Sequence, residues 1–158
     1  MADLSQRHCI VWIFGLTFMK EFKELVREGK VEKRTPDFAE AESLLQQAKE
    51  RLNDLLTLSL NEQNASFRFE SAYESLREAL QAFLAKRGYK PYSHEAIIAF
   101  VFEEKIISEK ESRIIDRYRE IRNDINYRAT KVTVEETKEI ISFVRNILPH
   151  LKEIFHQK

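Results

Sequence analysis

Three glycines and three prolines are spread over the 158 residues of this chain. A fold with many tight turns uses more of both, because glycine reaches positive φ angles and proline pre-sets φ in turns. No segment alternates apolar and polar side chains for long enough to predict a β-strand. The scarcity of turn residues therefore favours long helices joined by short connections.

Apolar residues recur at three- and four-residue spacing in several segments, and these segments are bounded by residues that commonly cap helices. A first helix is predicted from residue 19 to 28, and a second is expected to begin with Thr35 as N-cap and Pro36 in its first turn. The other expected boundary residues are Gly29, Gly88, Ser93, Ser108 and Thr133. Together these signals predict an all-α fold, an antiparallel up-and-down bundle of about five to six helices.

Composition narrows the function only slightly. The 26 basic and 26 acidic residues cancel, so the chain as a whole has no drive toward nucleic acid or an anionic membrane, and only a local basic site stays open. The single cysteine, Cys9, cannot form an internal disulfide, which fits a reducing, cytoplasmic setting. The four histidines do not have the spacing of a zinc site, and no glycine-rich phosphate loop is present, so neither a metal nor a cofactor is expected.

Residues 1–18 differ in character from the rest. An apolar run from Cys9 to Met19 is short for a bilayer span and lacks a small-residue cleavage site after it. We therefore expect no membrane span, although membrane or secretory targeting is the alternative for this segment. The run is interpreted as an N-terminal extension that adds a core or oligomer segment, or that precedes the natural start at Met19. The helical domain is then expected to cover residues 19–158.

Residues 113–128 contain the segment most suited to chemistry. At 100° per residue, Arg119, Arg122 and Asn126 fall on one flank of the expected helix, at the edge of its apolar stripe. Asn123 and Tyr127 lie further round. Two arginines and an asparagine on one flank are able to clamp a phosphate through bidentate hydrogen bonds. The same side chains are equally suited to pairing with carboxylates on a neighbouring helix.

The run Arg119-Glu-Ile-Arg-Asn-Asp-Ile-Asn-Tyr127 resembles the signature region of the HEPN superfamily, in which an Arg, often followed by Asn, precedes a His by a few residues. Residues 73–80 resemble the long central helix of that family, and residues 88–102 resemble the loop and short helix that follow. The resemblance covers roughly residues 19–156. It places Arg122 at the motif arginine, Asn123 after it, and Tyr127 where the catalytic histidine stands.

The resemblance implies a helical bundle that dimerises around this motif. Many HEPN domains are metal-independent ribonucleases, including toxins, and others act beside a nucleotidyltransferase partner. The tyrosine at position 127 departs from the motif, because a phenol with a pKa near 10 is a poor base at neutral pH, whereas histidine titrates there. His94 is an alternative proton carrier, although it is also explained as the first residue after an N-cap.

The sequence thus leads to one hypothesis and two alternatives. The chain is expected to bind RNA or a nucleotide at Arg119, Arg122, Asn123, Asn126 and Tyr127, as a homodimer, in a toxin–antitoxin or nucleotidyltransferase-linked system. A non-catalytic helical interaction module is the first alternative. A metal-independent ribonuclease is the second, with Arg122, Tyr127 and His94 as the catalytic candidates.

Overall fold

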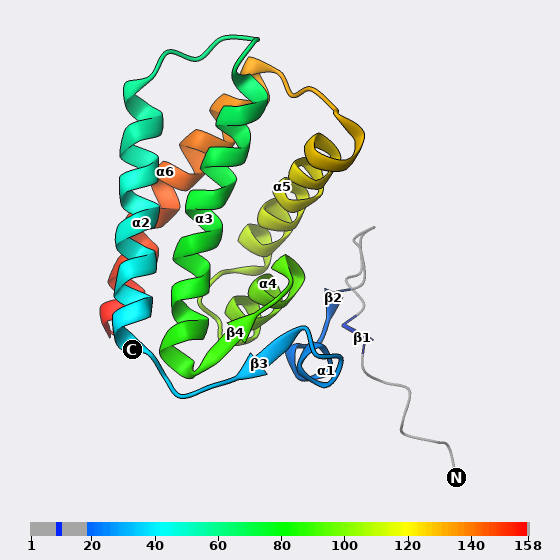
Figure 1. The fold of residues 1–158 in the computed structure, drawn as a ribbon, viewed down its shortest axis with the longest axis vertical. Coiled ribbons are helices and arrows are strands. Elements are labelled where there is room, and N and C mark those ends of the chain that lie inside the picture. Colours follow the sequence, from blue (N-terminus) through cyan, green and yellow to red (C-terminus); the bar gives the residue numbers. More distant parts are fainter. Residues whose placement is uncertain (1–8, 11–18, 158) are drawn as a thin grey trace.

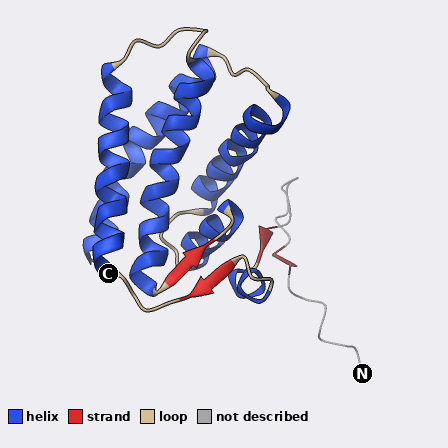
Figure 2. Cartoon of the chain, in the orientation of Figure 1, coloured by secondary structure: helices blue, strands red, loops and turns tan. Residues whose placement is uncertain are grey.

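The computed structural model describes residues 9–10 and 19–157. The predicted N-terminal extension, residues 1–18, therefore lies outside the described residues except for Cys9 and Ile10. The described chain forms six helices and two small antiparallel sheets (Figures 1 and 2). The helices are α1 (Phe22–Arg27), α2 (Phe38–Thr57), α3 (Ala65–Arg87), α4 (His94–Glu103), α5 (Glu109–Arg128) and α6 (Val134–Gln157). The strands are β1 (Cys9–Ile10), β2 (Met19–Lys20), β3 (Val31–Lys33) and β4 (Tyr89–Pro91).

The predicted all-α bundle is confirmed. Helices α2 and α3 form an antiparallel hairpin, α6 packs against both of them, and α4 and α5 lie along the other side of α3 (Figure 1). None of the helices in the described part of the chain is both long and apolar enough to cross a bilayer.

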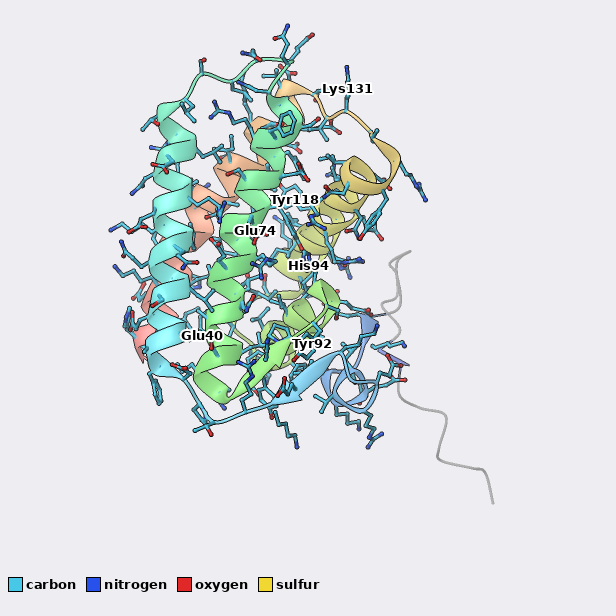
Figure 3. The ribbon with its side chains drawn as sticks, viewed as in Figure 1. Glu40, Glu74, Tyr92, His94, Tyr118 and Lys131 are labelled. Atoms are coloured by element: carbon cyan, nitrogen blue, oxygen red, sulfur yellow. The ribbon has the colours of Figure 1, made fainter. Side chains whose placement is uncertain are left out.

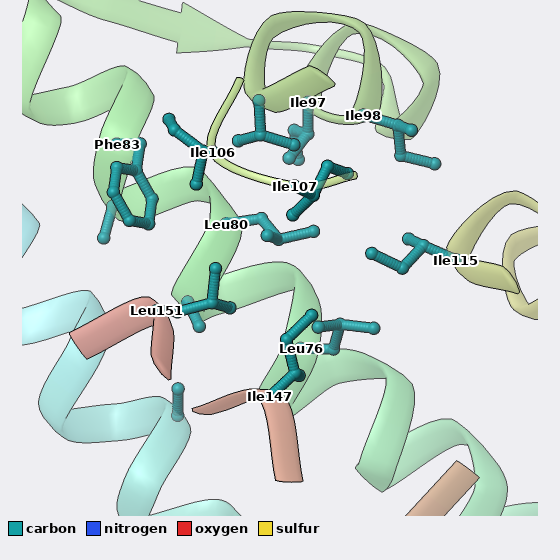
Figure 4. Close-up of a cluster of buried hydrophobic side chains, with 14 of the residues drawn as sticks. Leu76, Leu80, Phe83, Ile97, Ile98, Ile106, Ile107, Ile115, Ile147 and Leu151 are labelled. Atoms are coloured by element: carbon teal, nitrogen blue, oxygen red, sulfur yellow. The ribbon is translucent and has the colours of Figure 1, made fainter. Parts of the chain in front are cut away.

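Helix α3 is the centre of the core because its neighbours surround it. It buries the aromatic and aliphatic stripe that the spacing predicted, and the side chains of α4, α5 and α6 meet that stripe (Figure 4). Leu76 and Leu80 are at most 1% exposed, as are Ile115 of α5 and Leu151 of α6. Removing so much apolar surface from water supplies the main driving force for folding.

Three of the predicted helix starts are confirmed by their hydrogen bonds. The Ser93 hydroxyl accepts from the Ala96 N–H at 3.1 Å and begins α4. Ser108 and Thr133 each form a reciprocal capping box with a glutamate three residues later, Glu111 and Glu136. These caps satisfy N–H groups that a helix start otherwise leaves unpaired.

The predicted start of the second helix is wrong. Asp37, not Thr35, is the N-cap of α2, since its carboxylate accepts from the Glu40 N–H at 2.8 Å. The residues before it are held extended, because the Arg34 N–H donates to the Gly88 carbonyl and the Asp37 N–H to the Ala85 carbonyl at the end of α3.

The N-terminal helix and the strands also differ from the sequence prediction. Helix α1 begins at Phe22 rather than at Met19, because Met19 and Lys20 pair with Ile10 and Cys9. Strands β3 and β4 pair over three residues each, so they are too short to give the alternating pattern by which strands are predicted. This second ladder ties the segment after α1 to the connection between α3 and α4.

Candidate phosphate site between α3, α4 and α5

Helix α5 buries a face that the sequence assigned only in part. Ile114, Ile121 and Ile125 form an apolar stripe that packs against the core, but Asp116, which falls on the far side of that stripe, is 8% exposed. Its carboxylate accepts a hydrogen bond from Nε of Arg119 at 2.7 Å. This pairing between residues three apart explains why a charged group is tolerated there.

A tyrosine–histidine pair joins α3 to α4 beside that face. The Tyr73 hydroxyl and Nδ1 of His94 are 3.1 Å apart, and the two rings are stacked with centroids 5.6 Å apart. Tyr73 is 2% exposed, whereas His94 is half-buried at the first residue of α4. Figure 3 shows His94 between the ribbons of α3 and α5, with Glu74 of α3 nearby.

The surroundings keep both rings of this pair neutral. Burial raises the pKa of the Tyr73 phenol well above its ordinary value, so the hydroxyl keeps its proton at physiological pH. Burial, reinforced by the positive charges of Arg122, Arg77 and Arg119, lowers the pKa of His94 to about 4. The hydroxyl and Nδ1 therefore share one neutral hydrogen bond, and which of the two groups donates depends on the tautomer of the imidazole.

Two of the three arginines around the pair are neutralised by carboxylates on their own helices. Nε of Arg77 lies 3.0 and 2.9 Å from the two carboxylate oxygens of Glu74, and one Nη of Arg77 donates to the side-chain oxygen of Gln81. Arg119 is held by Asp116 in the same way. These ion pairs hold the guanidinium groups of Arg77 and Arg119 in place.

Arg122 is different. Its guanidinium makes no ion pair and no hydrogen bond with any of the residues that the structure describes. Its charge nevertheless helps burial to lower the pKa of His94, and it offsets part of the rise that burial causes in the pKa of Tyr73. The side chain is half-buried, so its stem packs against the protein while its charge stays available. An unpaired guanidinium beside buried polar groups is suited to binding an anion.

The structure brings together three of the residues that the sequence singled out, namely His94, Arg119 and Arg122. The others are not part of this cluster. The Asn126 side chain donates to the Arg122 carbonyl, so it supports the helix backbone, and Asn123 is half-buried without a side-chain hydrogen bond. Tyr127 is 82% exposed and makes no ring contact with the described residues. We call Tyr73, Glu74, Arg77, His94, Asp116, Arg119 and Arg122 the arginine–histidine cluster.

Sequence reasoning missed the contribution of α3. Tyr73 lies in the core, as its helical spacing predicts, and its hydroxyl also contacts His94 of the cluster. Glu74 and Arg77, whose spacing predicts an ion pair on the helix surface, do form that pair, but it is partly buried and both charges act on His94. Tyr73 and Arg77 are four residues apart and so share a helix face. A basic residue one turn after a buried tyrosine was the available signal, although it does not reveal which helix lies opposite.

Among the described residues, no three histidine, cysteine, aspartate or glutamate side chains lie close enough to hold an ion. A groove of about 870 Å³ does occur elsewhere, between α2 and α6, where Glu42 and His156 pair across it at 3.0 Å. Its lining residues belong to α2 and α6, so the groove is separate from the arginine–histidine cluster.

Comparison with known proteins gives one match. The family model described as HEPN domain matches residues 41–154, well over half of the chain, and this range includes every member of the cluster. No curated protein and no solved structure matches the chain significantly.

Proposed function

The chain belongs to the HEPN domain family, and from that premise we propose that it binds RNA or a nucleotide through a phosphate group held at the arginine–histidine cluster. In this proposal Arg122 forms the principal charge contact. Arg119 and Arg77 extend the positive surface, and His94 adds a ring nitrogen, Nε2, as a further polar group. Asn123 borders the contact, whereas Asn126 and Tyr127 lie toward the exposed end of α5.

The observation that carries this proposal is the unpaired guanidinium of Arg122. Arg77 and Arg119 are each satisfied by a carboxylate on their own helix, but no acidic side chain of the described residues is placed against Arg122. Placing a third arginine beside two others is electrostatically unfavourable unless an anion compensates it. A phosphate oxygen pair matches the planar fork of a guanidinium and supplies that compensation.

A metal-independent ribonuclease is the second candidate, and one observation favours it. The charge of Arg122 acts on His94, so a proton carrier and a group suited to phosphate binding belong to one cluster. In cleavage by 2′-OH attack, His94 would then take the part that the family motif gives to the histidine replaced here by Tyr127. A cleavage assay on RNA without added metal, comparing the protein with a His94→Gln variant, tests this candidate.

We further propose a homodimer in which the α5 helices of two copies approach one another. Two features of α5 support it. Ile121 and Ile125 are only partly buried within one copy, and Tyr127 beyond them exposes most of its ring. Large aromatic side chains are favoured at interfaces. Light scattering should give a dimer for the protein and a monomer for Tyr127→Arg, whereas a monomer in both cases would contradict the proposal.

Because some members of the family act beside such proteins, we also propose that the chain has a nucleotidyltransferase partner or a toxin–antitoxin partner. Identifying the genes adjacent to this one tests it directly. A neighbouring minimal nucleotidyltransferase supports that pairing. A non-catalytic interaction module is the alternative, and it predicts that the protein binds a partner protein but no phosphate-bearing ligand.

The binding proposal is tested by comparing Arg122→Ala with Arg117→Ala. Arg117 is an exposed arginine on the same helix, so its removal changes the net charge equally without touching the cluster. We expect Arg122→Ala to weaken binding of oligoribonucleotide or nucleotide by about 1.5–3 kcal/mol, the range for hydrogen bonds to charged groups. Both variants should unfold at nearly the temperature of the parent. If the two variants lost the same binding free energy, the loss would be due to the change in net charge alone, and the proposal would be contradicted.

A further inference from the structure

A long groove runs between α2 and α6, which lie antiparallel to one another (Figure 1). Its lining residues extend from Glu42 to Asn53 on α2 and from Arg145 to His156 on α6, so each wall is about 16 Å long at 1.5 Å per residue. Glu42 and His156 meet at one end of it, with 3.0 Å between carboxylate oxygen and Nε2. The volume of about 870 Å³ is therefore spread over roughly three helical turns. We call it the α2–α6 groove.

The floor of the α2–α6 groove is apolar. Leu45, Leu52 and Leu148 line it and are 8%, 7% and 8% exposed, whereas the leucines of α3 are at most 1% exposed. The exposed ring of Pro149 borders them on α6. The hydrophobic core thus reaches the surface along this groove, and an apolar surface laid on it would remove these side chains from water.

The walls of the α2–α6 groove are basic. Lys49 of α2 and Arg145 and Lys152 of α6 line it, and none of these cations forms an ion pair within the described ranges, 9–10 and 19–157. Glu42, the acidic residue of the lining, is already paired with His156. Because the whole chain has no net charge, these cations are a local excess, and their electrostatic complement is an acidic surface.

The three cations are distributed along the groove rather than gathered at one end. Arg145 and Lys152 are two turns apart on one wall. Lys49 is seven residues from Glu42 on the other wall, so in an antiparallel pair it falls opposite Pro149, between them. A ligand with a single charged head group would reach only part of this array. An α-helix with acidic residues on both sides of an apolar stripe meets the floor and all three cations.

Two other occupants fit the groove less well. No phenylalanine, tyrosine or tryptophan of the described residues lines it, so it offers no aromatic ring on which an RNA base could stack. A second copy of the chain, placed by a twofold axis, would bring the same cations against one another.

We propose that the α2–α6 groove is the docking site for an acidic amphipathic helix of a partner protein. The apolar stripe of that helix covers the leucine floor. Its acidic side chains pair with Lys49 on one side and with Arg145 and Lys152 on the other. Because the groove is separate from the arginine–histidine cluster, the partner and a phosphate-bearing ligand can be bound at the same time, and the docking site goes beyond the proposed phosphate-binding function.

The test uses two synthetic helical peptides of about 14 residues, four turns, which is long enough to span the groove. Both have leucines at positions i, i+3, i+7 and i+10, and they differ only in that the flanking residues are glutamates in one and lysines in the other. A covalent staple on the outward face makes both helical before binding, because short helices are only marginally stable in water. Fluorescence anisotropy measures their binding to the full chain.

The protein variants reverse charge inside or outside the groove. Arg145→Glu removes one exposed cation of the wall, and a double variant combines it with Lys152→Glu. Arg117→Glu, at an exposed position on α5, changes the net charge as Arg145→Glu does but lies outside the groove. Thermal unfolding checks that each variant is as stable as the parent.

We expect the glutamate peptide to bind the parent and Arg117→Glu equally, and to bind Arg145→Glu about tenfold more weakly. The lysine peptide should bind the double variant but not the parent. In NMR spectra of the parent, the methyl groups of Leu45, Leu52 and Leu148 should shift when the glutamate peptide binds, whereas those of Ile115 on α5 should not.

Three results would overturn the docking site: no binding of the glutamate peptide, equal binding of both peptides by the parent, or methyl shifts confined to another face. A fourth concerns RNA. If Arg145→Glu bound an oligoribonucleotide less well than Arg117→Glu does, the groove would be assigned to RNA and the docking site would again be overturned. Binding of a phosphate-bearing ligand at Arg122 is unaffected by the first three results.

Discussion

The Tyr73 hydroxyl and Nδ1 of His94 lie 3.1 Å apart, with the tyrosine almost entirely buried and the histidine half-buried. The contact joins the central helix α3 to the first residue of α4. It is a hydrogen bond that links two helices, and it holds the imidazole of His94 against the buried ring of Tyr73.

Tyr73→Phe should lower the free energy of unfolding by about 1 kcal/mol, because the hydrogen bond between its buried hydroxyl and His94 is lost. The pKa of His94 should stay well below its ordinary value, because the burial and the positive charges of Arg122 and Arg77 that lower it to about 4 are unchanged. Denaturant unfolding measures the first effect, and titration of the His94 ring protons by NMR measures the second. Tyr118→Phe is the matched control, since Tyr118 is also buried but has no such contact with His94. A His94 pKa near 6.5 in Tyr73→Phe alone would contradict the assignment of the low pKa to burial and charge.

His94 should make the protein less stable as the medium becomes acidic. Its pKa is about 4 in the folded protein and near 6.5 in the unfolded chain, so the unfolded chain binds the proton more readily. The contribution is fully present above about pH 6.5 and is lost as pH falls toward about 4. Because half of the imidazole reaches solvent, we expect the loss to be on the order of 1–2 kcal/mol.

Denaturant unfolding at several pH values measures this contribution. The free energy of unfolding of His94→Gln should fall less between about pH 6.5 and about pH 4 than that of the parent. His150→Gln, at an exposed position, should show the same dependence of unfolding free energy on pH as the parent. Identical slopes in all three proteins would show that His94 is protonated equally in the folded and unfolded states.

Arg51→Ala should be strongly destabilising. The Glu78 carboxylate is 5% exposed and receives two hydrogen bonds from Arg51, at 3.1 and 2.8 Å. Removing the arginine leaves a buried charge uncompensated, at a cost of about 3 kcal/mol in unfolding free energy. Arg128→Ala, which breaks the exposed pair with Asp124, should cost less than about 1 kcal/mol. Comparable losses in the two variants would show that water reaches Glu78.

Gly88→Ala and Gly29→Ala form a matched pair. Both glycines have positive φ, so alanine strains either position by roughly 1–2 kcal/mol. A Cβ at Gly88 would in addition lie 2.4 Å from the Arg34 carbonyl oxygen, whereas one at Gly29 would meet nothing within 4 Å. Thermal unfolding should therefore show a clearly larger loss for Gly88→Ala. Equal losses would mean that the segment around Arg34 moves aside without cost.

The fold could be predicted from the sequence because its signals are local. The caps at Ser93, Ser108 and Thr133, and the stripe along α3, each depend on residues within a few positions of one another. The true cap of α2 was missed because its position depends on contacts with the end of α3, more than forty residues away in the sequence. A helix boundary fixed by tertiary contacts leaves little trace in the local pattern.

The site was predicted only in part for the same reason. The flank of α5 with Arg119 and Arg122 follows from 3.6-residue periodicity, but the side chains opposite it come from α3 and α4. Which arginine stays unpaired depends on which carboxylate lies next to each guanidinium group. The spacing of residues along a helix does not predict these contacts. Tyr127, selected by its place in a motif, lies at the exposed end of its helix.

The β3–β4 ladder has a consequence for the order in which the protein folds. It pairs Val31 with Pro91 and Lys33 with Tyr89, residues between which the whole α2–α3 hairpin lies in the sequence. Closing so long a loop is entropically expensive until the hairpin has formed, so we expect these strands to join late. Strand β4 ends three residues before His94. In hydrogen exchange, the amides of β3 and β4 should then open more readily than those of α3, and the histidine should be among the last groups to reach its native position and the first to leave it.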